Sequence, residues 1–424
     1  MLMILALGFV ACEPGKKGES EHRPPNIIYI LADDLGYGDL GCYGQELFAT
    51  PRLDQLAKHG IRFTRHYAGS TVCAPSRSVL MTGLHTGHTP IRGNQEVRPE
   101  GQWPLPATSH TLAEGLKEAG YVTGAFGKWG LGYPGSEGDP LNQGFDYFFG
   151  YNCQRYAHRY YPEYLWKNSD KVYLEGNDWS ATTTYAPDLI QQHTLDFIRE
   201  FKDTAFFAFV PMVIPHAELI VPEDDIFRQY LGSYPETPYV GRPGADYGPD
   251  MKISMYCCQE FPHATFAAMM RRLDVYVGEI VDLIEDLGLS ENTLIMFTSD
   301  NGPHMEGGAD PDFFNSNGGL RGYKRDLYEG GIRVPLLARW PNHIPRGTTT
   351  AQPAIGYDLH TTFASVADTS AGVTDGTNLL PVLTQEQTLP ERELIWHFPY
   401  YHPERGYAKA PDKIGVDDFV TSRT

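Results

Sequence analysis

Short apolar runs alternate with amphipathic segments from residue 26 onward, and this alternation constrains the fold more than any other feature of the sequence. Residues 27–31 are apolar throughout and predict a buried strand, whereas residues 266–287 carry apolar side chains at helical spacing. Strands that alternate with helices are typical of an α/β fold with a largely parallel central sheet. The other predicted elements are a helix that begins at Pro51 after Thr50 as its N-cap, helices at 108–119 and 187–201, and strands at 121–126, 205–213, 293–298 and 332–338.

Polar side chains follow four of the predicted strands at the point where each strand ends. These side chains are Asp33 and Asp34, Lys128, His216, and Asp300 and Asn301. In open α/β sheets, ligands bind beyond the carboxyl ends of the strands. One polar residue at a strand end is usually a turn former, but four such ends together predict a functional site at one edge of the sheet.

Asp33, Asp34, Asp300 and Asn301 offer three carboxylates and one amide oxygen. Carboxylates that are crowded together raise one another's pKa, and a bound divalent cation relieves this repulsion. Ligation by oxygen alone favours Ca²⁺ or Mg²⁺ over zinc. The alternative is that each Asp-containing pair only forms a turn, which would be the better interpretation of either pair alone.

Cys73 precedes a segment with helical character, in which Pro75 fits the first helical turn. A cysteine at a helix N-terminus faces backbone N–H groups that favour negative charge. The residues alone therefore indicate an activated thiolate or an anion-binding site, with a buried structural cysteine as the alternative.

The segment Cys73-Ala74-Pro75-Ser76-Arg77 resembles the C-x-P-S-R signature of type I sulfatases, in the alkaline phosphatase superfamily. Other segments resemble the family's remaining motifs, in the family's order, along nearly the whole chain. They are residues 26–34 and 299–302 for the metal motifs, 127–129 and 319–324 for the lysine motifs, 215–217 for the histidine motif, and the segment 329–335. The resemblance implies an arylsulfatase A-like carbohydrate sulfatase, built as a three-layer sandwich around a large, mixed, mostly parallel sheet.

The resemblance also implies that a formylglycine-generating maturation enzyme oxidises Cys73 to formylglycine (3-oxoalanine). The hydrated aldehyde carries two hydroxyls on one carbon: one attacks sulfur, and collapse of the other to a carbonyl expels sulfate. A serine would instead leave a sulfate ester that water must attack. The implied ligands of Ca²⁺, or of Mg²⁺, are Asp33, Asp34, Cys73, Asp300 and Asn301.

By the same resemblance, Arg77 steadies the formylglycine, and Lys128 and Lys324 hold the sulfate group and stabilise developing charge. His216 protonates the leaving oxygen. The metal orients the nucleophile and neutralises sulfate oxygens as a Lewis acid.

Two residues depart from the family's pattern. Gly130 stands where the family usually has the histidine of G-K-W-H, so we expect the base that assists sulfate release to be His158, His304 or not needed. Leu84 stands where the family commonly has the arginine of T-G-R, which removes an auxiliary cation but leaves the signature intact. Both departures indicate a distinct subgroup.

The ends of the chain flank a predicted catalytic domain of residues 26–395. Residues 1–25 are apolar at first, pass through Cys12 and then become polar, which resembles a bacterial lipoprotein signal followed by a tether. We therefore expect an exported protein, periplasmic or attached to the cell surface through a lipidated Cys12; ordinary cleavage or a misassigned start are the alternatives. Residues 396–424 predict a missing or truncated form of the family's small C-terminal antiparallel sheet.

The charge balance limits the kinds of molecule that the chain is expected to bind. Lysine and arginine number 34 against 53 acidic residues, which gives a formal net charge of −19. This argues against nucleic-acid binding through a basic face, but a few local cations can still bind a small anion.

Residues 150–161 interleave tyrosines with Arg155 and His158, and aromatic faces and cations of this kind can bind sugar rings and sulfates. We expect Arg155, His158 and His304 to contact a glycan-derived sugar sulfate, with galactose or N-acetylgalactosamine sulfate favoured. A tyrosine-rich loop that only packs on the domain is the alternative for these residues. The alternative functions are a phosphomonoester or phosphodiester hydrolase of the same superfamily, and an inactive sulfoglycan-binding protein in which Cys73 stays unconverted.

Overall fold

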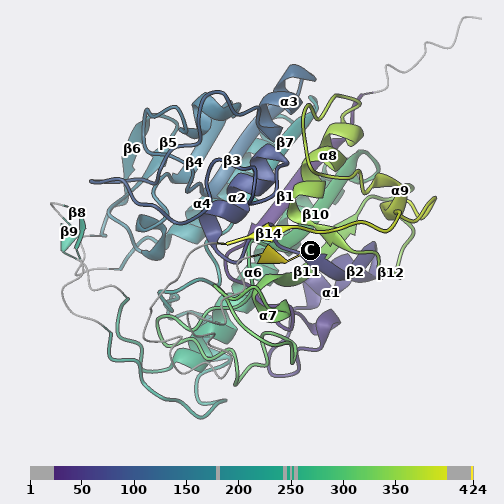
Figure 1. The fold of residues 1–424 in the computed structure, drawn as a ribbon. Coiled ribbons are helices and arrows are strands. Elements are labelled where there is room, and N and C mark those ends of the chain that lie inside the picture. The colour runs from purple at the N-terminus through teal and green to yellow at the C-terminus, as the bar shows by residue number, and fades with distance from the viewer. Residues whose placement is uncertain are drawn as a thin grey trace, which may run out of the picture.

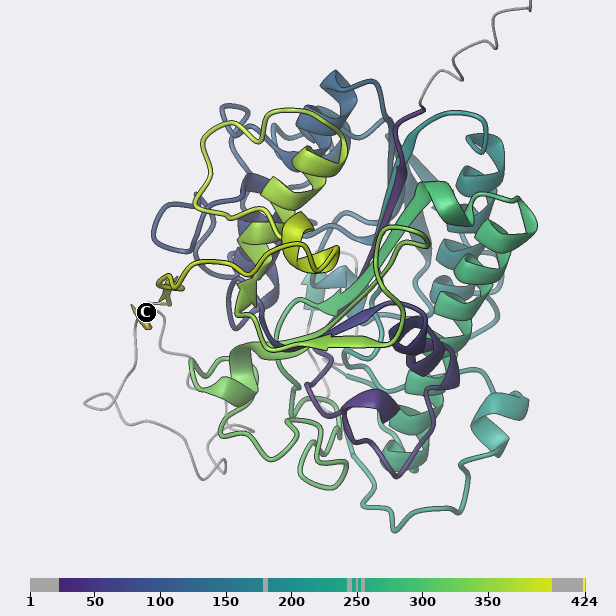
Figure 2. The same ribbon diagram turned by 90° about the vertical axis from the view of Figure 1, so that its right-hand side faces the viewer.

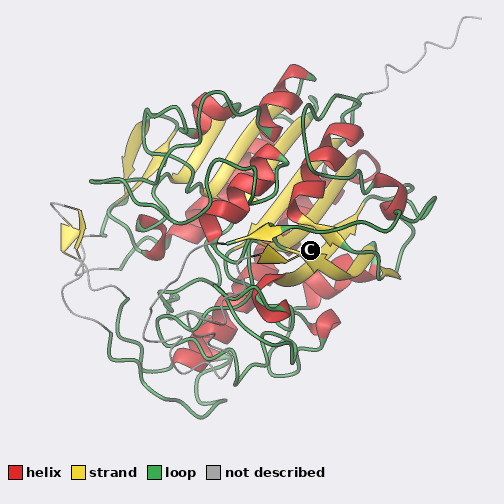
Figure 3. Cartoon of the chain, in the orientation of Figure 1, coloured by secondary structure: helices red, strands yellow, loops and turns green. Residues whose placement is uncertain are grey.

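The computed structural model describes residues 23–177, 182–241, 246–248, 251–252, 256–398 and 422–423. Within these residues, an eleven-stranded mixed sheet runs through the molecule in the order β12-β2-β11-β10-β1-β7-β3-β4-β5-β6, with β13 also beside β2 (Figures 1 and 3). Its strands are β1 (Asn26–Ala32), β2 (Ile61–Tyr67), β3 (Val122–Lys128), β4 (Tyr147–Tyr151), β5 (Tyr164–Lys167), β6 (Asp170–Tyr173), β7 (Phe206–Pro211), β10 (Thr293–Ser299), β11 (Arg333–Arg339), β12 (Thr348–Thr350) and β13 (Ala354–Ile355). Two further pairs are β8 (Asp246–Gly248) with β9 (Met251–Lys252), and β14 (Trp396–His397) with β15 (Ser422–Arg423).

The middle of the sheet is parallel, the strands next to it on both sides are antiparallel, and β12 and β13 are parallel to β2. Strand β1 lies between β10 and β7, and β3 lies between β7 and β4, with all four of these pairings parallel. Strands β11 and β2 on one side and β5 and β6 on the other are added in antiparallel pairings. The carboxyl ends of the parallel strands therefore meet at one edge of the sheet.

Helices cover both faces of the sheet, so the molecule has three layers (Figure 2). Alternate side chains of β1 enter two separate cores: Ile28 and Ile30 pack on one face, and Ile27, Tyr29 and Leu31 on the other. Helices α1, α4 and α6 contribute to the first core, and α2, α3 and α8 contribute to the second. The helices are α1 (Pro51–Lys58), α2 (Cys73–Thr82), α3 (Leu112–Glu118), α4 (Ala186–Glu200), α5 (Asp225–Arg228), α6 (Pro262–Asp286), α7 (Glu329–Ile332), α8 (Gly356–Val366) and α9 (Leu380–Leu383).

The predicted fold class is confirmed, and most of the predicted elements lie within a few residues of their observed bounds. Helix α3 begins at Leu112 rather than near residue 108, because Thr111 and Glu114 form a reciprocal capping box at its start. Residues 130–180, where the sequence predicts no helix or strand, contain β4, β5 and β6. Their short, tyrosine-rich segments lack the regular apolar alternation that marks a strand in sequence.

The ends of the chain are described only in part. Cys12 and the rest of the predicted signal segment lie outside the described residues, as does most of the segment 396–424. From the latter, the structure describes only residues 396–398 and the pair of β14 with β15. None of the helices in the described part of the chain is long and apolar enough to cross a membrane.

Candidate active site

The carboxyl ends of β1, β3 and β10 bring the predicted metal and cation residues to one place. Asp33 and Asp34 directly follow β1, and Asp300 directly follows β10, beside it. The backbone N–H of Asp34 donates to Oδ1 of Asp300 at 3.0 Å, which ties the two strand ends together. Asp34 has a φ of +63°, a left-handed conformation that aspartate tolerates better than most residues. All three carboxylates are buried.

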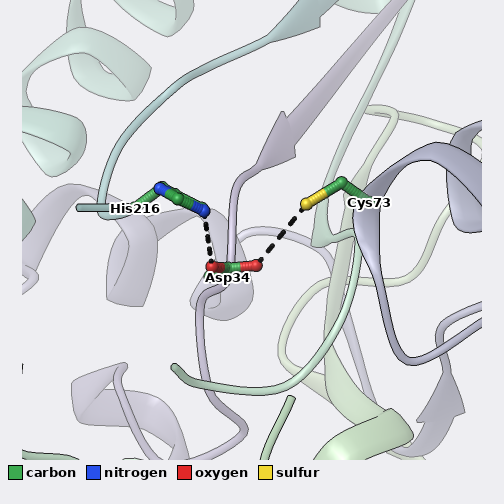
Figure 4. A group of neighbouring side chains, drawn as sticks. All are labelled: Asp34, Cys73 and His216. Atoms are coloured by element: carbon green, nitrogen blue, oxygen red, sulfur yellow. Dashed lines mark hydrogen bonds and ion pairs between the residues drawn. The ribbon is translucent and has the colours of Figure 1, made fainter. Parts of the chain in front are cut away.

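Cys73 is the first residue of α2, and its side chain is 1% exposed. Its Sγ lies 3.6 Å from Oδ1 of Asp33 and 3.9 Å from Oδ1 of Asp34. Figure 4 shows Asp34 between Cys73 on one side and His216 on the other. Burial raises the pKa of the Cys73 thiol, and although Lys128 and Lys324 oppose this, the pKa stays above its usual value. An unmodified Cys73 is therefore a neutral thiol, not the activated thiolate that the helix position alone suggested.

Arg77 lies one turn further along α2 and is buried among the strand ends. Its Nε and Nη2 donate to Oδ2 of Asp300 at 3.1 and 2.8 Å, and its Nη1 donates to the carbonyl of Lys128 at 2.5 Å. The guanidinium group thus joins β10 and β3. The structure places Arg77 in contact with the carboxylates that surround residue 73.

The two predicted lysines each pair with one of the two aspartates after β1. Nζ of Lys128 donates to Oδ2 of Asp33 at 2.6 Å, and Nζ of Lys324 donates to Oδ2 of Asp34 at 2.7 Å. Burial alone would lower the pKa of both lysines, but the paired carboxylates more than offset it, so both values lie above the ordinary lysine pKa. Both side chains therefore carry a fixed positive charge.

His216 sits between Lys324 and two other imidazoles. Its Nδ1 lies 2.5 Å from the carbonyl of Ala217, to which it donates, and its Nε2 accepts from Nζ of Lys324 at 3.0 Å. The rings of His158 and His304 both stack on the ring of His216, with centroids 4.4 and 5.3 Å from its centroid. Burial and the neighbouring lysines lower the pKa of His216 well below its usual value.

The donor set fits a hard divalent cation. Oxygens of Asp33 and Asp300 and the sulfur of Cys73 lie within 4.8 Å of one another, as do ligand atoms of Asp34, Cys73 and His216. Oδ1 of Asn301 is buried and has no hydrogen-bond partner among the described residues, whereas its Nδ2 donates to Oδ1 of Asp34 at 2.6 Å. A buried, unpaired amide oxygen beside three carboxylates is the kind of ligand that Ca²⁺ or Mg²⁺ binds.

A cavity of about 210 Å³ opens next to His216 and Lys324. Arg155 and His158, two of the predicted substrate residues, line this cavity, and Arg155 also pairs with Glu96 at 3.0 Å. Its walls also include Glu96, Gln154, Tyr256 and Glu306.

His304 was also predicted to contact substrate, but it is not among the residues that line the cavity. Its Nε2 lies 3.2 Å from the carbonyl of Pro215, and its Nδ1 accepts from the backbone N–H of Glu306 at 3.1 Å. Both ring nitrogens therefore bond to the backbone, and His304 supports the ring of His216 instead of lining the cavity.

Sequence reasoning missed Glu306, Gln154 and Tyr256. Glu306 follows the Asp300 motif in a glycine-containing loop, and a single acidic residue in such a loop carries no distinguishing pattern. Tyr256 lies far from the other site residues in sequence and reaches the cavity only through the tertiary fold. Each of these residues is recognisable only once the strand ends have been brought together.

Gly130, the departure next to Lys128, has a φ of +79°. A Cβ atom there would lie 3.1 Å from Oε1 of Gln154, so Gln154 occupies the space beside this position. Of the two predicted replacements, His158 and His304, His158 lines the cavity, and its ring stacks on that of His216.

Comparison with known proteins gives a consistent result at the level of sequence. A family described as Sulfatase matches residues 25–369. The dog N-acetylgalactosamine-6-sulfatase is 33% identical over 403 residues, which cover 88% of this chain and 69% of the relative. Human arylsulfatase A is 35% identical over 398 residues, which cover 91% of this chain and 72% of the relative.

The solved structure of Ps i-CgsB in complex with k-i-k-neocarrahexaose is also similar. It is 28% identical, with a TM-score of 0.69 over 86% of this chain and 77% of that chain. The alkaline-phosphatase-like arrangement predicted from the motifs is thus shared with a solved protein that binds an oligosaccharide.

Proposed function

The chain belongs to the sulfatase family and is a sulfuric ester hydrolase, and from this premise we propose that it removes sulfate from a glycan-derived sugar through a formylglycine at position 73. The observation that carries the proposal is the convergence of Cys73, three buried carboxylates and two charged lysines beside one cavity. Formylglycine, when present, would supply a hydrated aldehyde as nucleophile, and Ca²⁺ would act as a Lewis acid.

The residues of the chain have separate tasks in this reaction. Asp33, Asp34, Asp300 and Asn301 would hold the cation, together with the group at position 73. Lys128 and Lys324 are fixed in place by Asp33 and Asp34, so their charges are oriented before substrate arrives. Donors that need no reorganisation stabilise developing negative charge most effectively, and both lysines meet that condition.

We expect His216 to protonate the leaving oxygen, with Lys324 beside it. His216 donates through Nδ1 to a backbone carbonyl, which leaves Nε2 as the atom that faces Lys324 at 3.0 Å. Because the pKa of His216 is lowered and that of Lys324 is raised, Lys324 keeps its charge, and we expect a protonated His216 to act as the acid that gives its Nε2 proton to the leaving oxygen. The stacked rings of His158 and His304 keep His216 in this orientation.

The substrate class rests on the cavity and on the named relatives. Arg155 and His158 provide donors in the cavity, while Gln154 and Glu306 provide acceptors, which suits a ring that carries several hydroxyls. One relative is an N-acetylgalactosamine-6-sulfatase, and a similar solved structure holds a carrageenan-type oligosaccharide. We therefore favour galactose or N-acetylgalactosamine sulfate.

Two measurements test the proposal. The first is a mass spectrum of the peptide that contains residue 73, from protein made in a host with a maturation enzyme; an aldehyde in place of the thiol is expected. The second is sulfate release from a panel of monosaccharides sulfated at defined positions. A persistent thiol would exclude the mechanism, and hydrolysis of phosphate esters alone would exclude the function. Binding of sulfated sugars without turnover would favour the inactive binding protein.

A further inference from the structure

Glu306 places a carboxylate at the edge of the sulfate site, although none of the metal or sulfate roles above requires it. Its Oε2 lies 3.3 Å from Nζ of Lys324 and 3.4 Å from Nε2 of His216, and it accepts a hydrogen bond from the hydroxyl of Tyr256 at 3.2 Å. Its Oε1 pairs with Nη2 of Arg325 at 2.7 Å. The side chain is 9% exposed and lines the cavity.

This carboxylate is permanently charged. Burial alone would raise the pKa of Glu306, but Lys324 and Arg325 lower it well below its usual value. Two cations and a tyrosine hydroxyl also hold its oxygens in place, so the charge cannot turn away from an incoming anion. Any oxyanion that binds to Lys324 is therefore repelled by a fixed negative charge on the same lysine.

Repulsion by one fixed charge grows with the charge of the bound anion. A sulfate monoester carries one negative charge, whereas inorganic sulfate, which is the product, and a phosphate monoester near neutral pH carry two. At a separation of about 5 Å and an effective dielectric constant of about 20 to 40, repulsion by Glu306 lowers the affinity of an anion at least tenfold for each unit of its charge. A doubly charged oxyanion therefore loses about the square of that factor.

We propose that Glu306 is a specificity-determining residue that discriminates against doubly charged oxyanions. The inference rests on the proposed sulfatase site. It has two consequences: the product sulfate is released in preference to the ester, and phosphate monoesters are excluded even though the surrounding cations would attract them. Arg325 and Tyr256 hold the carboxylate in position for this role.

The test compares two anions of similar shape and different charge, sulfate and methanesulfonate, by calorimetric titration of the calcium-loaded protein at pH 8. Binding is measured instead of turnover, so the result does not depend on catalytic activity. In Glu306→Gln we expect affinity for methanesulfonate to rise at least about tenfold and affinity for sulfate at least about a hundredfold, so their ratio shifts at least about tenfold. Glu306→Ala is the second removal variant, and Glu306→Asp, which keeps the charge, should retain the wild-type ratio.

Glu96→Gln is the matched control. Glu96 also lines the cavity, but its side chain is 49% exposed and pairs with Arg155 instead of Lys324, so its removal should leave the ratio within about twofold. Binding of both anions with an unchanged ratio in Glu306→Gln and Glu306→Ala would overturn the inference and leave the sulfatase assignment intact. Failure of the wild-type protein to bind either anion would overturn the anion site itself, and the inference with it.

Discussion

Replacement of Arg77 by lysine tests whether the guanidinium fork organises the site. Arg77 makes two hydrogen bonds to Asp300 and one to the carbonyl of Lys128, all of them buried. A lysine keeps the charge, but one ammonium on a shorter and differently shaped side chain can retain about one of the three contacts. Because a buried hydrogen bond to a charged group contributes about 1.5–3 kcal/mol, we expect Arg77→Lys to lower the free energy of unfolding by about 3 kcal/mol.

Arg77→Met removes the charge as well and leaves Asp300 without its cation, so we expect a loss of about 3–5 kcal/mol. The assay is urea unfolding of the unmodified cysteine form, so that conversion of residue 73 does not enter. With Ca²⁺ present the loss should be smaller than in chelator, because the cation supplies part of the missing positive charge. Arg52→Lys is the matched control: it alters an exposed pair with Asp282 and should change stability by no more than about 0.5 kcal/mol. If Arg77→Lys lowered the free energy of unfolding no more than the control does, the guanidinium group would not organise the site.

Three further predictions concern other parts of the site and the fold. Burial raises the pKa of Asp39 to about 7, above its unfolded value, so folding opposes its ionisation and the protein loses stability as pH rises from about 4 to 7. Asp39→Asn should remove up to about 4 kcal/mol of this pH dependence in urea unfolding measured across that range, and an unchanged slope would contradict the assignment. Gly130→His should not raise activity and should lower the free energy of unfolding by about 1–2 kcal/mol, because the residue is left-handed and Gln154 fills the adjacent space. Gly130→Ala measures the backbone contribution alone. A histidine variant that is more active than the wild type would contradict this prediction. Calcium at about a hundred times its dissociation constant should stabilise the chelated protein by about 2.7 kcal/mol, seen as a rise in the thermal unfolding midpoint, and no rise would speak against the proposed cation site.

The sequence predicted strands that contain long apolar runs and missed the shorter strands β4, β5 and β6. Strands β1 and β10 are covered on both faces, so each has a continuous apolar run in its middle, and the pattern is unambiguous. Strands β5 and β6 are short, partly exposed and antiparallel, and their side chains follow no clear alternation. Their pairing depends on β4 being in place, which is a tertiary property.

The same division holds for the site. Asp33, Lys128 and Asp300 were predicted to lie together because strand ends in a parallel sheet share an edge. Glu306 could not be predicted, since it reaches the cavity from a loop. Its role depends on its contact with Lys324, which only the tertiary fold creates. His304 was assigned to the substrate because of its neighbourhood in sequence, whereas its ring nitrogens bond to the backbone.

The burial of Cys73 sets a limit on when its side chain can be altered. The central strand β1 is completed only when Asn26 pairs with Thr293, and Asp34 meets Asp300 at the same time. At roughly 5–20 residues per second, the ribosome adds the roughly 220 residues from Cys73 to Thr293 in roughly 10–45 s. During that interval β1 can pair with β7 but not with β10, so the end of β1 beside Cys73 lacks one of its two neighbours. In the folded protein Cys73 is 1% exposed, so the conversion proposed for it would have to precede the docking of β10.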